Sequence, residues 1–146
     1  MLKVFRTLKA SHMKFRGIIL SRDDDIISQC FEVCSEVGIA LVKKNEFAGF
    51  ILDLQENDYD LVICDCSDTF SVCHNWVKII KRINPKTPLI VLNEKTTPNE
   101  GGILYQEGIF NLMEKPIDTK IIKEIISATV SFINHSNKPN SNYGNI

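Results

Sequence analysis

The sequence has no strong excess of charge of either sign and no long apolar run. Its 146 residues carry a formal net charge of -1, which gives no electrostatic reason to expect nucleic acid or an anionic membrane as the main partner. No apolar stretch approaches the roughly 20 residues that span a bilayer. The N-terminus also lacks the apolar core and small-residue cleavage site of a signal peptide. We therefore expect a cytoplasmic protein that binds neither nucleic acid nor membrane.

The sequence also lacks several motifs that indicate a particular type of active site. The sequence contains no glycine-rich phosphate loop, no G-x-S-x-G and no Cys-His pair with an orienting partner. Its five cysteines include no C-x-x-C pair: Cys30 and Cys34 stand one helical turn apart, and Cys64 and Cys66 flank Asp65. An odd number of cysteines with these spacings predicts reduced, structural thiols rather than disulfides.

What remains is the composition of an ordinary globular domain. The content of 44% hydrophobic and 24% charged residues in a chain of this length predicts one domain with its own core. Ser11-His12-Met13 resembles the scar of a cloning vector, so residues 1–13 are interpreted as a leader or a disordered segment. Residues 134–146 are rich in Asn, Ser and Gly and are expected to form a disordered tail. The predicted folded unit is 14–133.

Within this unit, short apolar runs alternate with segments of helical spacing. The runs are typical of strands buried on both faces, and they span residues 17–20, 39–42, 61–64, 89–92 and 109–113. Asp23 to Asp25 and Gly38 supply the start and stop signals of the first helix. Between 93 and 108, Thr-Thr-Pro and Gly-Gly leave room only for a short helix at 103–107. The alternation predicts an α/β fold, a (βα)5 parallel sheet covered on both faces.

Two of the predicted strands end in charged residues of opposite sign. Asp65 closes the run 61–64, and Lys115 with Pro116 closes the run that begins at Ile109. Parallel strands present their carboxyl ends along one edge of the sheet, and ligands of open α/β sheets bind at that edge. We therefore expect the carboxylate and the ammonium to lie within hydrogen-bonding distance, as a small phosphate-handling site.

These segments resemble the receiver domain of response regulators, the CheY-like family. The resemblance rests on Tyr59-Asp60-Leu61-Val62-Ile63-Cys64-Asp65, on Gly108 through Lys115-Pro116, and on the register of Asp25-Ile26-Ile27 and Gly38. It covers the whole folded unit and implies a flavodoxin-like, doubly wound sheet of order 2-1-3-4-5.

The resemblance also implies a function in two-component phosphorelay signalling. The protein would be a single-domain receiver module and not an enzyme, with Asp65 as the phosphoacceptor and Lys115 as its partner. A histidine kinase or phosphotransfer protein would supply the phosphoryl group, and a downstream signalling protein would receive the signal. The sequence leaves the oligomeric state open.

Three functional positions depart from the family pattern. The acidic pair that holds Mg²⁺ falls on Ser21 and Arg22, the phosphoryl-contacting Ser/Thr falls on Asn93, and the aromatic switch residue falls on Leu112. Leucine has no polar tip to exchange between solvent and interior. We therefore predict a receiver that is atypical in both Mg²⁺ binding and switching.

The sequence does not decide whether the protein binds Mg²⁺. A hydroxyl is a poor replacement for a carboxylate ligand of Mg²⁺ and a guanidinium repels the ion, so Asp23, Asp65 and Ser67 are the candidate ligands that remain. Arg22 could instead reach Asp65 and form a bidentate ion pair in place of the metal, or it could point to solvent. The alternative function is a flavodoxin-like small-ligand-binding protein or enzyme that reuses the same sheet edge.

Overall fold

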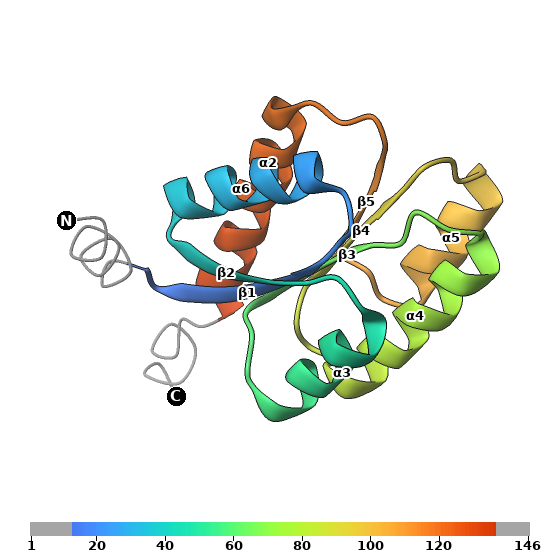
Figure 1. Cartoon of the computed structure of the whole chain (residues 1–146), viewed down its shortest axis with the longest axis horizontal. Helices are drawn as coiled ribbons and strands as arrows, with labels where there is room; N and C mark the ends of the chain where they lie inside the picture. The colour runs from blue at the N-terminus through green and yellow to red at the C-terminus, as the bar shows by residue number, and fades with distance from the viewer. Residues whose placement is uncertain (1–12, 137–146) are drawn as a thin grey trace, which may run out of the picture.

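The computed structural model describes residues 13–136, which form one parallel sheet with helices on both faces (Figure 1). The sheet has the order β2-β1-β3-β4-β5, which confirms the predicted doubly wound topology. Its strands are β1 (Phe15–Leu20), β2 (Ile39–Lys44), β3 (Leu61–Asp65), β4 (Leu89–Asn93) and β5 (Asn111–Glu114).

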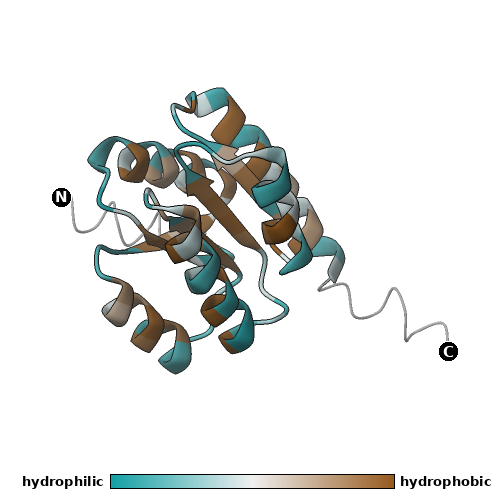
Figure 2. Ribbon diagram, turned by 90° about the vertical axis from the view of Figure 1, so that its right-hand side faces the viewer, coloured by the Kyte–Doolittle hydropathy of each residue, from teal (hydrophilic) through white to brown (hydrophobic). Residues whose placement is uncertain are grey.

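The helices divide between the two faces of the sheet. Helices α2 (Asp24–Val37) and α6 (Thr119–Ser136) cover one face, while α3 (Phe47–Glu56), α4 (Phe70–Ile83) and α5 (Pro98–Gln106) cover the other (Figure 1). Apolar strands run through the centre, and the more polar surfaces of the helices lie outside them (Figure 2). Both faces of every central strand are therefore buried, which explains why these strands are continuously apolar instead of alternating.

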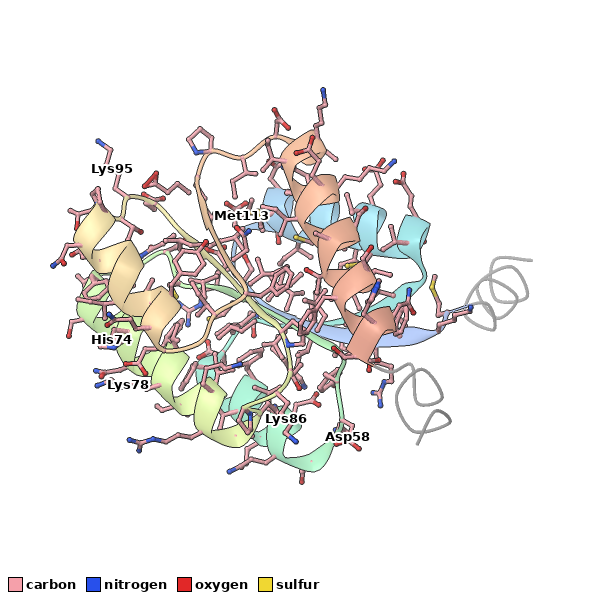
Figure 3. The ribbon with its side chains drawn as sticks, turned by 180° about the vertical axis from the view of Figure 1, so that it is seen from behind. Asp58, His74, Lys78, Lys86, Lys95 and Met113 are labelled. Atoms are coloured by element: carbon pink, nitrogen blue, oxygen red, sulfur yellow. A yellow bond between two sulfur atoms is a disulfide. The ribbon has the colours of Figure 1, made fainter. Side chains whose placement is uncertain are left out.

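Alternate side chains of each strand enter different apolar layers. On β3, Val62 and Cys64 pack toward α3, α4 and α5, whereas Leu61 and Ile63 pack toward α2 and α6. Met113 of β5 belongs to the second layer and lies in the interior beside α6 (Figure 3). This two-residue period continues past the strand ends and decides which polar side chains share a side.

Local signals fix the start and the end of α2 beside the site. The Asp23 carboxylate accepts hydrogen bonds from the backbone N–H groups of Asp25 and Ile26, as an N-cap does. Gly38 ends the helix at a φ of 85°, a left-handed conformation that favours glycine. The cap therefore holds the Asp23 carboxylate at the carboxyl edge of the sheet.

Several element boundaries differ from the sequence prediction. Helix α5 is Pro98–Gln106 and not the short helix 103–107, because Thr97 and Glu100 form a capping box and Pro98 occupies the first turn. Strand β5 begins at Asn111, two residues later than predicted, and α6 continues to Ser136, three residues beyond the predicted end of the fold. The interpretations of residues 1–12 as a leader and of 137–146 as a tail lie outside the described residues.

Between residues 13 and 136, none of the helices combines the length and the apolar character that crossing a membrane requires.

Candidate functional site

The register of β1 and β3 places Ser21 beside Asp65. Leu20 pairs with Cys64 in the parallel ladder, so the next residues along the two strands point to the same side of the sheet. The buried Ser21 hydroxyl donates a 2.6 Å hydrogen bond to Asp65 Oδ2. One of the two positions that the resemblance assigns to metal-binding acids thus holds a neutral donor to the aspartate.

Lys115 reaches the same carboxylate from just beyond the end of β5. Its Nζ atom lies 2.8 Å from Asp65 Oδ2, and the two side chains are only 12% and 2% exposed. The predicted proximity of the two residues is confirmed. A buried carboxylate without a partner would be costly, so the ammonium balances a charge that this position could not otherwise hold.

The Lys115 ammonium donates hydrogen bonds to three different side chains. Besides Asp65, Nζ contacts Ser67 Oγ at 2.7 Å and Asp23 Oδ2 at 3.2 Å. Burial works against the charged ammonium, but hydrogen bonding and charge from Asp65 and then Asp23 outweigh it and raise the pKa of Lys115. The bond from the Ile26 amide lowers the pKa of Asp23 most. Burial works against this shift, and hydrogen bonding and charge from Lys115 lower the pKa further. The cluster therefore keeps one ammonium between two carboxylates.

The two oxygens of Asp65 have different surroundings. Oδ2 accepts from both Lys115 and Ser21, whereas Oδ1 accepts a 2.7 Å hydrogen bond from the Ser67 hydroxyl. Ser67 is exposed, and its φ of 44° lies in the left-handed region. The loop between β3 and α4 therefore bends sharply to bring this hydroxyl over the carboxylate.

Arg22 does not take part in this cluster. Its guanidinium forms an ion pair with Glu46 at 3.1 Å and donates to the Asn45 carbonyl at 3.0 Å, with 75% of the side chain exposed. Because Arg22 follows Ser21 on the chain, it points to the opposite side of the sheet edge. The ion pair between Arg22 and Asp65 is a wrong expectation, and the solvent-facing alternative describes the structure.

The candidate metal ligands fit Mg²⁺ poorly. Asp23, Asp65 and Ser67 do converge, but all three oxygens already bind the Lys115 ammonium. In the described part of the chain, His, Cys, Asp and Glu side chains form no group of three that could hold a metal ion. Mg²⁺ demands near-octahedral oxygen coordination, and an ion bound by Asp23 Oδ2, Asp65 Oδ2 and Ser67 Oγ would have to displace the Lys115 ammonium.

Asn93 is brought to the site but supports the loop instead of facing the carboxylate. Its buried Oδ1 accepts from the backbone N–H of Glu94 at 3.0 Å and from that of Asp68 at 3.4 Å. The amide thereby ties the end of β4 to the loop that carries Ser67.

Leu112 lies away from this cluster, half-buried against α5. Its backbone N–H donates a 3.0 Å hydrogen bond to the Tyr105 hydroxyl. The aromatic side chain with a polar group beside β5 therefore belongs to α5 and not to the strand. The sequence analysis did not single out Tyr105, although the short helix that it predicted, 103–107, includes this residue. The capping box at Thr97 and Glu100 was the signal for the longer helix.

The prediction of reduced cysteines throughout is wrong for one pair. Cys66 and Cys73 form a disulfide, while Cys30, Cys34 and Cys64 are free. The exit of β3 and the first turns of α4 bring the two Cα atoms to 5.4 Å, although the spacing of seven residues matches no common motif. The two cysteines meet because of the tertiary structure, and their spacing in the sequence does not reveal this.

An open hollow of about 630 Å³ lies over the cluster. Phe47 and Trp76 form part of its wall, with ring centroids 4.5 Å apart in a stacked arrangement. Trp76 is half-buried at the edge of the core. The hollow gives a molecule from solvent access to Asp65, Cys66 and Lys115.

No protein-family model matches the sequence, and no curated protein matches it either. Solved structures do resemble this fold. A CheY-like receiver domain protein of Methanospirillum hungatei has a TM-score of 0.73 at 11% identity, covering 84% of this chain and 98% of that one. A response regulator of Thermotoga maritima has a TM-score of 0.70 at 18% identity, with coverage of 82% and 99%. An orphan response regulator of H. pylori reaches 0.70 at 15% identity, with coverage of 80% and 96%.

At these identities the likeness establishes the fold and leaves the chemistry of the site to be argued from its own residues. The similarity covers nearly the full length of each of these three neighbours and most of this chain. Residues 13–136 therefore have the fold of the CheY-like receiver domains of response regulators, with the five-stranded order and the polar edge that their sequence pattern predicts.

Proposed function

We propose that this protein is a receiver module of a two-component phosphorelay, in which Asp65 accepts a phosphoryl group. The observation that carries the proposal is the 2.8 Å pair between Asp65 and Lys115 at the carboxyl edge of a receiver-type sheet. The module signals by contact with other proteins, in the cytoplasm, and does not turn over a substrate. Its partners are a histidine kinase or phosphotransfer protein and a downstream signalling protein.

The hydrogen bonds of Asp65 favour one oxygen as the nucleophile. Oδ1 accepts from Ser67 alone, whereas Oδ2 is held by Lys115 and Ser21. Oδ1 attacks the phosphorus of a phosphohistidine, and the P–N bond breaks with its electron pair passing to the imidazole, which takes up a proton. The product is an acyl phosphate. The Lys115 ammonium offsets the charge of the incoming phosphoryl oxygens.

We further propose that Mg²⁺ is dispensable and that the fixed cation is Lys115 and not Arg22. Three hydrogen bonds from one ammonium to the candidate metal ligands support this assignment. Switching is atypical as well. Asn93 already binds two backbone N–H groups, and Leu112 packs on α5 without a polar group to reorient. Signal transmission then depends on the Ser67 loop more than on β5.

The proposal is tested by intact-mass spectrometry after incubation with acetyl phosphate, with and without Mg²⁺. We expect the mass of one phosphoryl group to be added in both conditions, and the addition to disappear in Asp65→Asn. Asp68→Asn is the matched control, because Asp68 is an exposed carboxylate of the same loop. A gain that survives in Asp65→Asn, or no gain under either condition, contradicts the assignment. A gain only with Mg²⁺ contradicts the metal-independent form alone.

The hollow favours a second candidate function, the binding of a small ligand. Its volume of about 630 Å³ falls within the range of ligand pockets, and the stacked Phe47 and Trp76 offer an apolar wall beside charged groups. The chain contains a single tryptophan. Titration with nucleotides and flavins, followed by Trp76 fluorescence, tests this alternative. Saturable quenching by one of them would support a binding protein over a receiver.

A further inference from the structure

The disulfide closes the loop that carries Ser67. Cys66 directly follows Asp65 at the end of β3, and Cys73 lies at the fourth position of α4. The segment between them contains the loop residues Ser67, Asp68 and Thr69 and the first three residues of α4. Thr69 caps α4 by accepting a hydrogen bond from the Val72 N–H. A covalent bond across this segment restricts how far the loop can move relative to the helix.

The same loop contacts the proposed nucleophile. Ser67 Oγ donates to Asp65 Oδ1 at 2.7 Å and accepts from Lys115 Nζ at 2.7 Å. The Asp68 N–H donates to Asn93. The position of the loop relative to α4 therefore decides whether the Ser67 hydroxyl stays over the carboxylate.

The surroundings of the sulfur atoms single out one point of attack. Cys66 is 6% exposed and lines the hollow, whereas Cys73 is completely buried. A third sulfur, that of Cys64, lies 3.9 Å from Cys66 but is also completely buried. A thiol from solvent can approach Cys66 through the hollow, while the other two sulfurs are enclosed by the core.

The other cysteines provide an internal contrast. Cys30 and Cys34 are both buried on α2, on the opposite face of the sheet, and remain unbonded. They lie one helical turn apart on a single helix, where the side chains point in nearly parallel directions. The Cys66–Cys73 bond instead joins two separate elements.

We propose that Cys66 and Cys73 are a redox-modifiable pair whose disulfide locks the Ser67 loop onto α4 and so controls access to Asp65. Disulfides in a reducing compartment are usually transient or redox-sensing, which fits a cycling pair better than a permanent link. The assignment of the pair stands without the phosphoacceptor role, and its effect on Asp65 chemistry rests on the proposed function.

Reduction by a small thiol of the glutathione class proceeds in two steps. The thiolate of the first molecule attacks Cys66 Sγ, the S–S bond breaks, and Cys73 leaves with the electron pair and takes up a proton. A second thiolate attacks the mixed disulfide, releasing the Cys66 thiolate, which is protonated, and the oxidised small-molecule disulfide. Two thiols supply the two electrons, and oxidised glutathione reverses both steps.

Peptide mass mapping tests the pair directly. The full chain is equilibrated with reduced or oxidised glutathione, unfolded in an excess of iodoacetamide, and digested without reductant. We expect a linked Cys66–Cys73 peptide in the oxidised sample, with alkylated Cys30, Cys34 and Cys64, and five alkylated cysteines in the reduced sample. Alkylation of all five after oxidation overturns the proposal. A link that persists in excess reduced glutathione also overturns it, because the pair would then be a permanent staple.

Trp76 reports the consequence for the loop. It follows Cys73 by one helical turn on α4 and stacks on Phe47 in the wall of the hollow. We expect reduction to change Trp76 fluorescence and to shift the amide signals of Ser67 and Asp68. Cys30→Ala should keep both responses, whereas Cys66→Ser and Cys73→Ser should each abolish them. Cys66→Ser is the milder of the two replacements, because it alters the sulfur nearest solvent.

The coupling to Asp65 is read separately. We expect acetyl phosphate to modify the reduced chain several-fold faster than the oxidised chain, and equal rates would overturn the control of access. If neither form is modified while the disulfide still cycles and shifts Ser67, the phosphoacceptor proposal fails and the redox pair stands.

Discussion

Lys115 and Arg22 are cations at the same carboxyl edge of one sheet, yet their environments are opposite. The ammonium of Lys115 is nearly enclosed and binds Asp23, Asp65 and Ser67, whereas the guanidinium of Arg22 is mostly exposed and meets Glu46 at the rim. The guanidinium of Arg22, which has more hydrogen-bond donors than the ammonium, is therefore the cation outside the cluster. Strand parity, and not the affinity of a side chain for carboxylates, decides which cation the site receives.

Removing Lys115 should have the largest effect. Lys115→Met leaves Asp65 buried without its counter-charge, so we expect the free energy of unfolding to fall by about 3 kcal/mol at neutral pH. Urea denaturation followed by circular dichroism measures this change. The double variant Asp65→Asn with Lys115→Met should recover part of the loss, because the uncompensated charge is gone. A loss no greater than that of Arg22→Met would erase the contrast between the two cations.

The pH dependence of stability should show the next-largest difference between Lys115 and Arg22. The pKa of Lys115 is raised above its ordinary value of 10.5 by Asp65 and Asp23, against the cost of burial. Its stabilising contribution is therefore fully present below pH 10.5 and is lost as the pH rises through the higher folded pKa. For Asp23 the pKa is lowered below 3.8, first by the Ile26 amide, so its contribution is present above pH 3.8 and is lost as the pH falls through the lower folded pKa.

Denaturation midpoints measured across the pH range check this expectation. The wild-type midpoint should be flat between these limits and fall at the alkaline end, and Lys115→Met should lack the alkaline fall. Arg22→Ala should keep the wild-type profile. An alkaline fall that is unchanged in Lys115→Met would assign it to other groups.

The smallest effect is expected at Arg22. Its ion pair with Glu46 is exposed, so Arg22→Ala should change the free energy of unfolding by less than about 0.5 kcal/mol. The neighbouring Ser21→Ala is the matched comparison. It removes a buried hydrogen bond to a carboxylate and should cost about 1.5 kcal/mol or more. The same urea titration measures the free energy of unfolding of both variants. Equal losses would mean that the side of the sheet on which the residue lies has no effect on its contribution to stability.

Much of the fold was predictable because it depends on patterns within short segments. The apolar runs, the Asp23 cap and Gly38 predicted the strands and α2, and parallel pairing then brought Asp65 and Lys115 together. The register of the structure then decides the parity: Ser21 and Asp65 occupy equivalent places after paired residues, so Ser21 and not Arg22 faces the carboxylate. The long α5 was encoded by its capping box, which the Gly-Gly pair obscured.

Other features of the site depend on tertiary geometry. The Cys66–Cys73 pair forms because the exit of β3 and the first turns of α4 bring the two Cα atoms to 5.4 Å, which neither segment specifies alone. The hydrogen bond between Lys115 and Ser67 depends on the left-handed conformation of Ser67, and serine carries no strong signal for that conformation. The phosphoacceptor role of Asp65 remains a prediction, which the acetyl phosphate experiment addresses. The switching roles of Asn93 and Leu112 remain predictions as well.

The bond between Tyr105 and the backbone of Leu112 has a consequence for aggregation. Strand β5 forms one border of the sheet, and a border strand normally offers unpaired N–H and C=O groups to any chain that can add a strand. Here the strand has four residues, and the Tyr105 hydroxyl already accepts the hydrogen bond of the Leu112 N–H. An incoming strand would have to displace that hydroxyl before it could extend the ladder, so this border of the sheet is protected against edge-to-edge polymerisation.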